Sequence, residues 1–277
     1  MKKRKHIALF LLSVAMLLFA ACSNIAVDGN AESSYIPARV TAQVTIDATA
    51  AKLDDIEIVP QQTAASQELQ GQQVDELMVR VLNVNHGDAT LLVGPQGETM
   101  LIDTGDSGER KMFREALEKA GVEKIDILSL SHPHSDHIGN AAWVLKKYPV
   151  GEVHMIKRAN DIRVYSDLLD QLEEKDTPVK IAEPGVTFQF AGATCEYLAP
   201  LNLMYPGLNN CSAVLRVTYG DCRFLFMADS ETEEENDLMQ KYDASALQAD
   251  FFKVGHHGTD STQQKFAALV KPKISAI

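Results

Sequence analysis

The sequence predicts an α+β domain in which two β-sheets pack face to face and helices cover their outer surfaces. Two observations predict this architecture. Early in residues 77–277, apolar runs of strand length are joined by short turns, as in antiparallel sheets. Later, strand-like runs alternate with segments of helical apolar spacing, and this progression occurs twice. The composition, 45% hydrophobic and 23% charged, fits one globular domain with extensions.

In the first half of the domain, short apolar runs between turn-forming residues predict β-strands. These strands are Met78 to Asn83, Ala89 to Val93, Thr99 to Ile102, Ile125 to Leu130 and Gly151 to Ile156. Apolar residues three and four apart predict helices between and after them. The helices are Lys111 to Ala120, His137 to Tyr148 and Val164 to Lys175. Gly121 ends the first helix and Pro149 follows the second, as helix-stop signals do.

The second half continues with further strands and fewer helices. The strands are Val179 to Ala182, Val186 to Phe190, Cys195 to Leu198, Ala213 to Tyr219, Arg223 to Met227, Ala249 to Val254 and Lys273 to Ile277. Ser230 to Glu233 has the sequence of a capping box, so a helix should begin there. The acidic run Glu231 to Glu235 is expected to be its solvated first turn. Phe266 to Val270 should end another helix.

The most specific pattern in the chain is His132-Pro133-His134-Ser135-Asp136-His137, directly after a predicted buried strand. Imidazole and carboxylate are ligands of zinc, manganese and iron, and packing four such groups into one turn is costly unless they bind something. His132 and His134 are two residues apart and point to the same side of an extended loop. Asp136 and His137 can face a second position beside the first. The spacing therefore predicts a site for two metal ions.

This motif and four other segments resemble the metallo-β-lactamase-fold hydrolases. Within that family they resemble the soluble hydrolase domain of ComEC competence proteins and their secreted relatives. The other segments are Val84 to Leu92, Leu101 to Gly105, Arg223 to Asp229 and Phe252 to Gly258, in the family's order. The resemblance implies the metallo-β-lactamase αββα sandwich. ComEC-like domains continue past a further strand, so the domain is expected to be truncated at its C-terminus, Ile277.

The resemblance also implies a role for each candidate ligand. The implied metal ligands are His132, His134, Asp136, His137, Asp229 and His256. The first two would bind one ion and the next two a second ion, while Asp229 would bridge both. His256 is expected to complete the second site because it comes first after its strand. His257 is expected at the cleft as a ligand, proton donor or substrate contact, and it and Asp136 are the expected catalytic residues.

The first metal position lacks an obvious third imidazole. Where many members of the superfamily have a histidine, this chain has Asn209 to Ser212, and Asn210 or a water is expected to fill the position. The expected cofactor is two divalent ions, zinc or manganese, and the oxygen-rich ligand set favours manganese. Asp88 and Asp103 lie in turns beside the cleft. Each either hydrogen-bonds to its own turn or supports the metal loop.

Residues 1–21 have the pattern of an export signal. A basic start is followed by an apolar stretch and by small residues before Cys22. This resembles a bacterial lipoprotein signal with Cys22 as the lipidation site, although an ordinary signal peptide or an uncleaved anchor fits the same pattern. The polar residues 22–76 predict a flexible linker, with a weak signal for a strand at Val40 to Ile46. The hydrolase domain 77–277 is therefore expected on the extracellular face of the bacterial cell membrane.

The chain is acidic, with a formal net charge of −12. Its overall field does not attract polyanions, which weighs against processive binding of DNA. Three cysteines follow Cys22. Cys195 and Cys222 lie in strand-like segments that could be neighbours, so one disulfide and one free thiol are an open alternative. Cys211 is expected to be a small apolar core residue rather than a metal ligand.

These observations favour an extracellular, membrane-tethered, metal-dependent hydrolase of phosphodiesters. The expected partners are the membrane, through the lipid anchor, and a phosphoester substrate such as nucleic acid or a cell-wall polymer. One alternative is a cell-wall phosphodiesterase resembling phosphorylcholine esterases, or a lactamase-type hydrolase, although lactamases normally carry the missing histidine. Another is a non-catalytic surface binding module in DNA uptake, which the short C-terminus favours. Metal content distinguishes the last alternative from the others.

Overall fold

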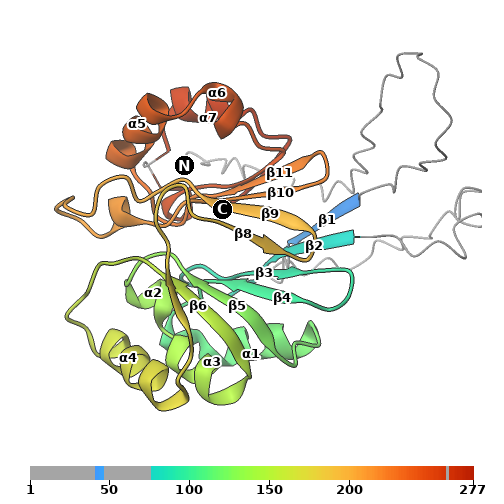
Figure 1. Cartoon of the computed structure of the whole chain (residues 1–277), viewed down its shortest axis with the longest axis vertical. Coiled ribbons are helices and arrows are strands. Elements are labelled where there is room, and N and C mark those ends of the chain that lie inside the picture. The colour runs from blue at the N-terminus through green and yellow to red at the C-terminus, as the bar shows by residue number, and fades with distance from the viewer. Residues whose placement is uncertain (1–40, 47–75, 260–261) are drawn as a thin grey trace, which may run out of the picture. The chain divides into compact units, whose positions relative to one another are not determined.

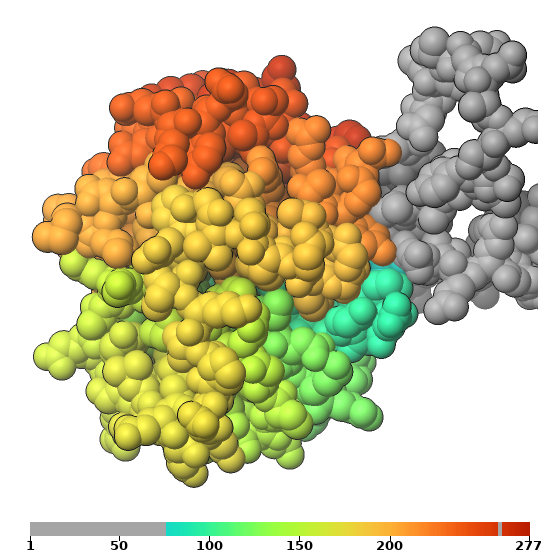
Figure 2. All heavy atoms as spheres, viewed as in Figure 1, coloured from blue at the N-terminus to red at the C-terminus, as the bar shows by residue number. Residues whose placement is uncertain are grey.

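The computed structural model describes residues 41–46, 76–259 and 262–277. The expected signal peptide 1–21, Cys22 and most of the expected linker lie outside the described residues. The described residues form two sheets, with strand orders β1-β2-β3-β4-β5-β6-β7 and β13-β12-β11-β10-β9-β8. Figure 1 shows the sheets as two layers with helices on the outer side of each. Figure 2 shows the two layers in direct contact on this face of the domain. The predicted α+β sandwich is confirmed.

The first sheet contains both antiparallel and parallel strands. Its members are β1 (Thr41–Ile46), β2 (Glu76–Val81), β3 (Thr90–Val93), β4 (Thr99–Ile102), β5 (Ile125–Leu130), β6 (Val150–Met155) and β7 (Val179–Ile181). β2 to β4 pair antiparallel, and β4 to β7 pair parallel. Helices α1 (Arg110–Lys119), α3 (Ala141–Lys147) and α4 (Arg163–Lys175) connect the parallel strands. β1 pairs with β2 and lies within 22–76, where the short strand was weakly predicted.

The second sheet is formed entirely by the later part of the chain. Its members are β8 (Thr187–Phe190), β9 (Ala193–Tyr197), β10 (Leu215–Tyr219), β11 (Cys222–Phe226), β12 (Phe251–Lys253) and β13 (Ile274–Ala276). β8 to β11 pair antiparallel, whereas β11 to β13 pair parallel. The helices on its outer face are α5 (Thr232–Lys241), α6 (Ala244–Leu247) and α7 (Gln264–Val270). The sequence analysis did not predict α6.

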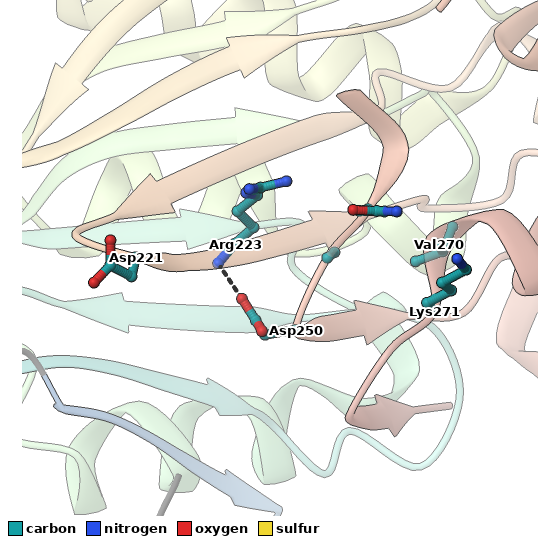
Figure 3. A pocket seen from close by; sticks show the side chains of 7 residues that line it. Asp221, Arg223, Asp250, Val270 and Lys271 are labelled. Carbon is teal, nitrogen blue, oxygen red and sulfur yellow. Dashed lines mark hydrogen bonds between the residues drawn. The ribbon is translucent and has the colours of Figure 1, made fainter. Parts of the chain in front are cut away.

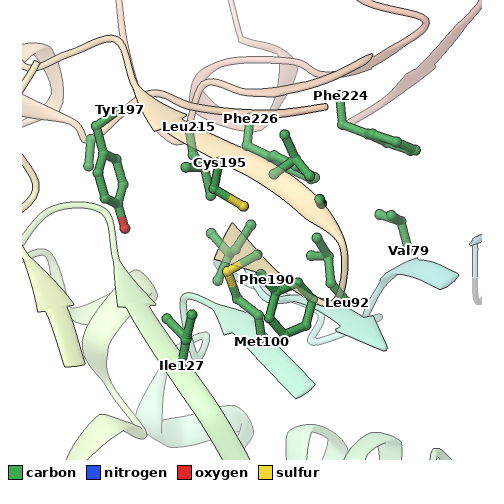
Figure 4. Close-up of a cluster of buried hydrophobic side chains, with 14 of the residues drawn as sticks. Val79, Leu92, Met100, Ile127, Phe190, Cys195, Tyr197, Leu215, Phe224 and Phe226 are labelled. Atoms are coloured by element: carbon green, nitrogen blue, oxygen red, sulfur yellow. The ribbon is translucent and has the colours of Figure 1, made fainter. Parts of the chain in front are cut away.

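Apolar side chains fill the space between the two sheets. β2 alternates half-buried and buried residues, which places Leu77 and Val79 on the inner face. Figure 4 shows Val79 and Met100 from the first sheet facing the same core as Phe224 from the second. Separate apolar clusters pack each sheet against its own helices. Each fully buried large side chain stabilises the fold by about 1.5–3 kcal/mol, so this core holds the sheets together.

Two predicted elements differ in the structure. The single helix expected from His137 to Tyr148 is divided into α2 (Ser135–Ile138) and α3. Asn140 interrupts it, because its side chain donates to the carbonyl oxygens of Thr104 and Asp106, at 2.8 and 2.9 Å. The acidic start of α5 is not solvated throughout, since Glu234 and Glu235 are fully buried. The capping box is also wrong, because Ser230 Oγ donates to Glu234 and the N-cap residue, Glu231, makes no capping hydrogen bond with its side chain.

The three late cysteines form no disulfide in the structure. Cys195 lies opposite Val217 on β10, and Cys222 lies opposite Tyr219 on the same strand. β10 therefore separates the two cysteines, and the disulfide between them is ruled out by sheet order. Cys211 is fully buried, as expected of a small core residue. Within the described parts of the chain, no helix has the length and apolar character needed to cross a membrane.

Candidate metal centre

The candidate ligands gather at one edge of the sandwich because the strands that carry them end there. β5 leads directly into the loop that contains His132 and His134, and its neighbour β4 ends directly before Asp103. In the other sheet, β11 precedes Asp229 and the adjacent parallel strand β12 precedes His257. Because parallel strands end at the same edge of a sheet, ligands distant in sequence become neighbours in space.

One ligand group consists of Asp136, His137, Asp229 and His257, whose ligand atoms lie within 4.8 Å of one another. His137 Nε2 is 3.1 Å from Asp229 Oδ1. His257 Nε2 is 3.3 Å from Asp136 Oδ2 and 3.5 Å from Asp229 Oδ1. Ligand atoms that each lie about 2.0–2.2 Å from a shared tetrahedral metal are separated from one another by distances close to those three. The arrangement therefore has the dimensions of a metal site.

Three atoms of this group are buried without a hydrogen-bond partner: His137 Nε2, Asp229 Oδ1 and His257 Nε2. Leaving buried polar atoms unpaired costs free energy, so their convergence on one point requires an explanation. A divalent cation would accept a lone pair from each of them. The residues present therefore fit a bound metal ion.

A second group joins His132, His134 and Asp229. His132 Nε2 is 3.0 Å from His134 Nδ1 and 3.8 Å from Asp229 Oδ2. Asp229 thus belongs to both groups, with one carboxylate oxygen directed to each. This is the geometry expected of a bridging carboxylate in a two-metal site.

The structure does not support His256 as the ligand that completes the second site. His256 Nδ1 lies 3.0 Å from Glu231 Oε1, outside both ligand groups, whereas His257 faces Asp136 and Asp229. The reason is local. The backbone N–H of His256 donates to the carbonyl oxygen of Ala228. Both histidines have positive φ angles, 46° and 52°, so the chain turns sharply and directs the second imidazole inward.

The structure gives the Asn210 side-chain oxygen partners at the start of α5. This oxygen, Oδ1, accepts from the backbone N–H groups of Glu231 and Glu234, at 3.0 and 3.2 Å, so it satisfies the start of α5. Ser212, which the sequence analysis did not single out, lies closer to the centre. Its Oγ is 3.3 Å from His132 Nδ1 and accepts from the Asp229 backbone N–H at 3.2 Å. Ser212 therefore links the two sides of the site.

Asp103 supports the metal loop rather than its own turn. This buried carboxylate accepts from Ser131 N at 2.8 Å and from Ser131 Oγ at 2.6 Å. Its Oδ2 also accepts from His137 Nδ1 at 2.8 Å. Holding the proton on Nδ1 leaves His137 Nε2 free to face the ligand group. Of the two alternatives for Asp103, the contacts favour the second one, in which it supports the metal loop.

The electrostatics of the centre keep its carboxylates ionised. Burial raises the pKa of Asp229, but the neighbouring imidazole of His137 outweighs it and holds that pKa well below its usual range. The pKa of Asp136 is lowered against burial by His257 and His137. Burial lowers the pKa of His137, yet Asp103 and Asp229 keep it well above its usual range.

A separate surface cavity of about 210 Å³ lies away from the metal centre. Its lining includes Arg223, Asp250 and Lys271, and Figure 3 shows the hydrogen bond from the Arg223 backbone to the Asp250 carboxylate. None of its lining residues belongs to either ligand group. This cavity and the metal centre are therefore lined by different residues.

This chain is similar in sequence to one protein family and to several characterised proteins. The pattern of the metallo-beta-lactamase superfamily matches residues 82–277. Three curated relatives each match 72% of this chain. ComE operon protein 3 of Bacillus subtilis is 27% identical over 218 residues and is covered to 28% of its length. Recombination protein 2 of Haemophilus influenzae is 29% identical and covered to 24%, and competence protein ComA of Neisseria gonorrhoeae is 29% identical and covered to 26%. The chain thus spans about a quarter of each relative.

Solved structures show weaker likeness. A Cronobacter sakazakii metallo-β-lactamase, a mutant of its HARLDQ motif, aligns with a TM-score of 0.47 and 17% identity, covering 70% of this chain and 89% of that one. The metallo-β-lactamase fold protein YhfI from Bacillus subtilis aligns with a TM-score of 0.45 and 15% identity, covering 69% and 80%.

Proposed function

This chain belongs to the metallo-β-lactamase superfamily, and from that premise we propose that it is a metal-dependent phosphodiesterase on the extracellular face of a bacterial membrane. The observation that carries the proposal is Asp229, which offers one oxygen to each of two ligand groups. The relatives are named for competence and recombination, which are processes of DNA, and this favours a phosphodiester substrate.

The chain's own residues have distinct roles in this proposal. His132, His134 and Asp229 would hold one divalent ion, zinc or manganese. Asp136, His137 and His257 would hold the other together with Asp229. When bound, such ions polarise a phosphoryl oxygen and activate a water molecule for attack. Asp103 orients His137, so the ligand set is arranged before metal or substrate arrives.

Side-chain exposure indicates how a substrate reaches the site. His137 and Asp229 are 0% and 3% exposed, whereas Asp136 and His257 are 18% and 28% exposed. A phosphodiester would therefore approach from the side of Asp136 and His257. These two residues are the proposed contacts to the reacting group, in agreement with their predicted catalytic role.

The proposal is tested with the purified chain loaded with Zn²⁺ or Mn²⁺. We expect cleavage of bis(p-nitrophenyl) phosphate and of DNA, and a loss of about 100-fold or more in Asp229→Asn. Asp221→Asn, in an exposed hairpin turn, is the control and should retain activity. A wild-type chain that cleaves no phosphodiester would contradict the proposal, and binding of fewer than two ions would favour the non-catalytic surface binding module.

A cell-wall phosphodiester is the second candidate substrate. The net charge of −12 disfavours DNA, a polyanion, whereas the cationic choline of phosphorylcholine esters offsets part of the charge of their phosphates. Initial rates on phosphorylcholine-bearing teichoic acid and on DNA, at equal phosphate concentration, distinguish the two. A lactam substrate serves as the third arm and should not be cleaved.

The membrane location rests on the N-terminal sequence. We propose that Cys22 carries the lipid that tethers the protein. Cys22→Ser should move the protein from the membrane fraction to the medium when it is expressed in a bacterium. Retention of the variant in the membrane fraction would instead indicate an uncleaved anchor.

A further inference from the structure

Lys253 is an unusual lysine. Among the residues that the structure describes, it is the one lysine or arginine that is buried, with 3% of its surface exposed. Its Nζ lies 2.8 Å from Oδ2 of Asp88, which is 6% exposed. Neither residue belongs to a ligand group. Burying a charged pair costs desolvation, and apolar side chains of similar size often serve stability equally well. The pair therefore calls for a role other than stability.

The pair spans the two sheets beside the metal centre. Asp88 lies in the turn between β2 and β3 of the first sheet, and Lys253 ends β12 of the second sheet. The backbone of Asp88 is attached to a candidate ligand, because its N–H donates to the carbonyl oxygen of Asp136 at 3.1 Å. Gly87 fits tightly in the same place, since a Cβ there would lie 2.0 Å from that oxygen. The position of Asp88 thus fixes the position of Asp136.

Lys253 is connected to the ligands of the other sheet. Its carbonyl oxygen accepts from Met227 N at 3.3 Å, two residues before Asp229. Lys253 itself precedes His257 by one short turn. The ion pair therefore joins the segment that holds Asp136 to the segments that hold Asp229 and His257. The ligand group of His132, His134 and Asp229 is held differently, through contacts of His132 with Ser131 and Ser212.

We propose that Asp88 and Lys253 act as a positioning pair that sets the distance of Asp136 from Asp229 and His257. The pair thereby determines how tightly an ion binds at the position formed by Asp136, His137, Asp229 and His257, called here the second metal position. It requires a fixed distance and direction between its charged atoms, which an apolar contact does not. The inference rests on the proposed function in one respect, namely that the centre binds two ions.

The test replaces the pair with apolar residues, Asp88→Leu with Lys253→Met, in the full chain. Zn²⁺ binding is measured by isothermal titration calorimetry and elemental analysis, and the melting temperature without metal is measured alongside. We expect an unchanged or higher melting temperature, one Zn²⁺ bound as in the wild type, and a second Zn²⁺ bound about 10–100-fold more weakly.

The matched control is Asp250→Leu with Lys273→Met, which removes a pair with the same 2.8 Å separation at a site away from the ligands. Both Zn²⁺ ions should bind this variant normally. If the apolar variant at 88 and 253 does not fold, Asp88→Asn with Lys253→Gln removes the charges but keeps a hydrogen bond across the gap. The same selective weakening of the second ion is expected in that variant.

The outcomes separate this inference from the proposed function. If the wild type binds two ions and the apolar variant binds both with unchanged affinity, the positioning role is wrong and the metal centre stands. If both ions are weakened equally with a lower melting temperature, the pair is merely structural. If the wild type binds fewer than two ions, the proposed function fails and the positioning role fails with it.

Discussion

Asp103 touches neither metal position, yet it controls the residue that belongs to one of them. It receives hydrogen bonds from His137 Nδ1 and twice from Ser131, and all of these groups are buried. Burial raises the pKa of Asp103, while His137 and Ser131 lower it in part. A carboxylate in this position both orients the imidazole and increases its basicity as a ligand.

Asp103→Asn should therefore weaken binding of the second Zn²⁺ about 10–100-fold, because an amide cannot accept from both Ser131 and His137 as the carboxylate does. Isothermal titration calorimetry measures this change. Asp221→Asn, in the exposed turn, should bind Zn²⁺ as the wild type does. Equal affinity in Asp103→Asn and the wild type would show that His137 is oriented by other contacts.

The sequence predicted which side chains gather at the candidate metal centre, except for the last one. His132, His134, Asp136, His137 and Asp229 do lie together, since a short motif and a strand end place them. The choice between His256 and His257 depends on two positive φ angles, and no residue pattern specifies these. Ser212 and Lys253 were missed because their contacts come from segments distant in sequence.

The turn before β3 is the element that fits most closely against the metal loop. Gly87 has φ of +96°, and its Cα faces the carbonyl oxygen of Asp136. Gly97, in the turn between β3 and β4, has a similar φ of +82° and open space around it. A side chain at either glycine would therefore cause similar backbone strain. Only at Gly87 would the side chain also collide with Asp136.

Gly97→Ala should lower the free energy of unfolding by about 1–2 kcal/mol, the cost of a left-handed conformation. Gly87→Ala should lower it by about 1–3 kcal/mol more, because the added methyl group overlaps the metal loop. Urea denaturation of the metal-free proteins measures both. Equal losses would mean that the turn moves away from Asp136 at little cost.

Helix α5 carries a pH-sensitive contact to α7. Glu235 is fully buried and accepts from the backbone N–H of Gln263 at 2.8 Å, next to the first residue of α7. Burial raises the pKa of Glu235 to about 7, against the hydrogen bonds that lower it. Burial raises the pKa of Glu234 as well. Because the folded pKa lies above the ordinary value of 4.5, the protonated form favours folding.

The stabilising effect of this protonation is complete below about pH 4.5 and is lost as the pH rises through 7. Between pH 5 and pH 8.5, the wild type should lose about 1–3 kcal/mol more stability than Glu235→Gln, which stays neutral. Denaturant unfolding at both pH values measures the difference. Glu173→Gln, on the exposed side of α4, should follow the wild type, and an identical pH dependence in all three would contradict the assignment.

For the domain as a whole, the metal centre is a connection between the two sheets. Four candidate ligands come from the loop after β5, while Asp229 and His257 come from the second sheet. An ion bound by both sets stabilises the folded domain and not the unfolded chain. Metal binding should therefore raise the free energy of unfolding of the whole domain, and not only the stability of one segment.

Zn²⁺ at 100 times its dissociation constant should raise the free energy of unfolding by about 2.7 kcal/mol, and a chelator should remove the gain. Thermal unfolding in both conditions measures the effect. Asp229→Asn should show little response because it removes the carboxylate shared by both ligand groups. A wild-type melting temperature that does not respond to Zn²⁺ would contradict the metal centre.

The whole fold was predictable where local patterns determine it. Apolar runs and turn residues gave the strands of both sheets, and the sandwich follows from their order. The pairing of β1 with β2 and the position of β10 between two cysteine-bearing strands were not predictable, because pairing is decided by contacts across the sheet. Burial of Glu234 and Glu235 was missed for a similar reason, since Glu235 contacts Gln263 beside α7 and the Glu234 backbone contacts Asn210, both distant in sequence.

The order of the ligands along the chain also bears on how the protein matures in the cell. During synthesis, His132 to His137 leave the ribosome well before Asp229 and His257. A half-made chain thus exposes imidazoles that can capture a wrong ion, but the complete set exists only after the second sheet has folded onto the first. Because divalent metals compete by affinity and availability, the compartment in which folding finishes helps to decide which ion the protein keeps.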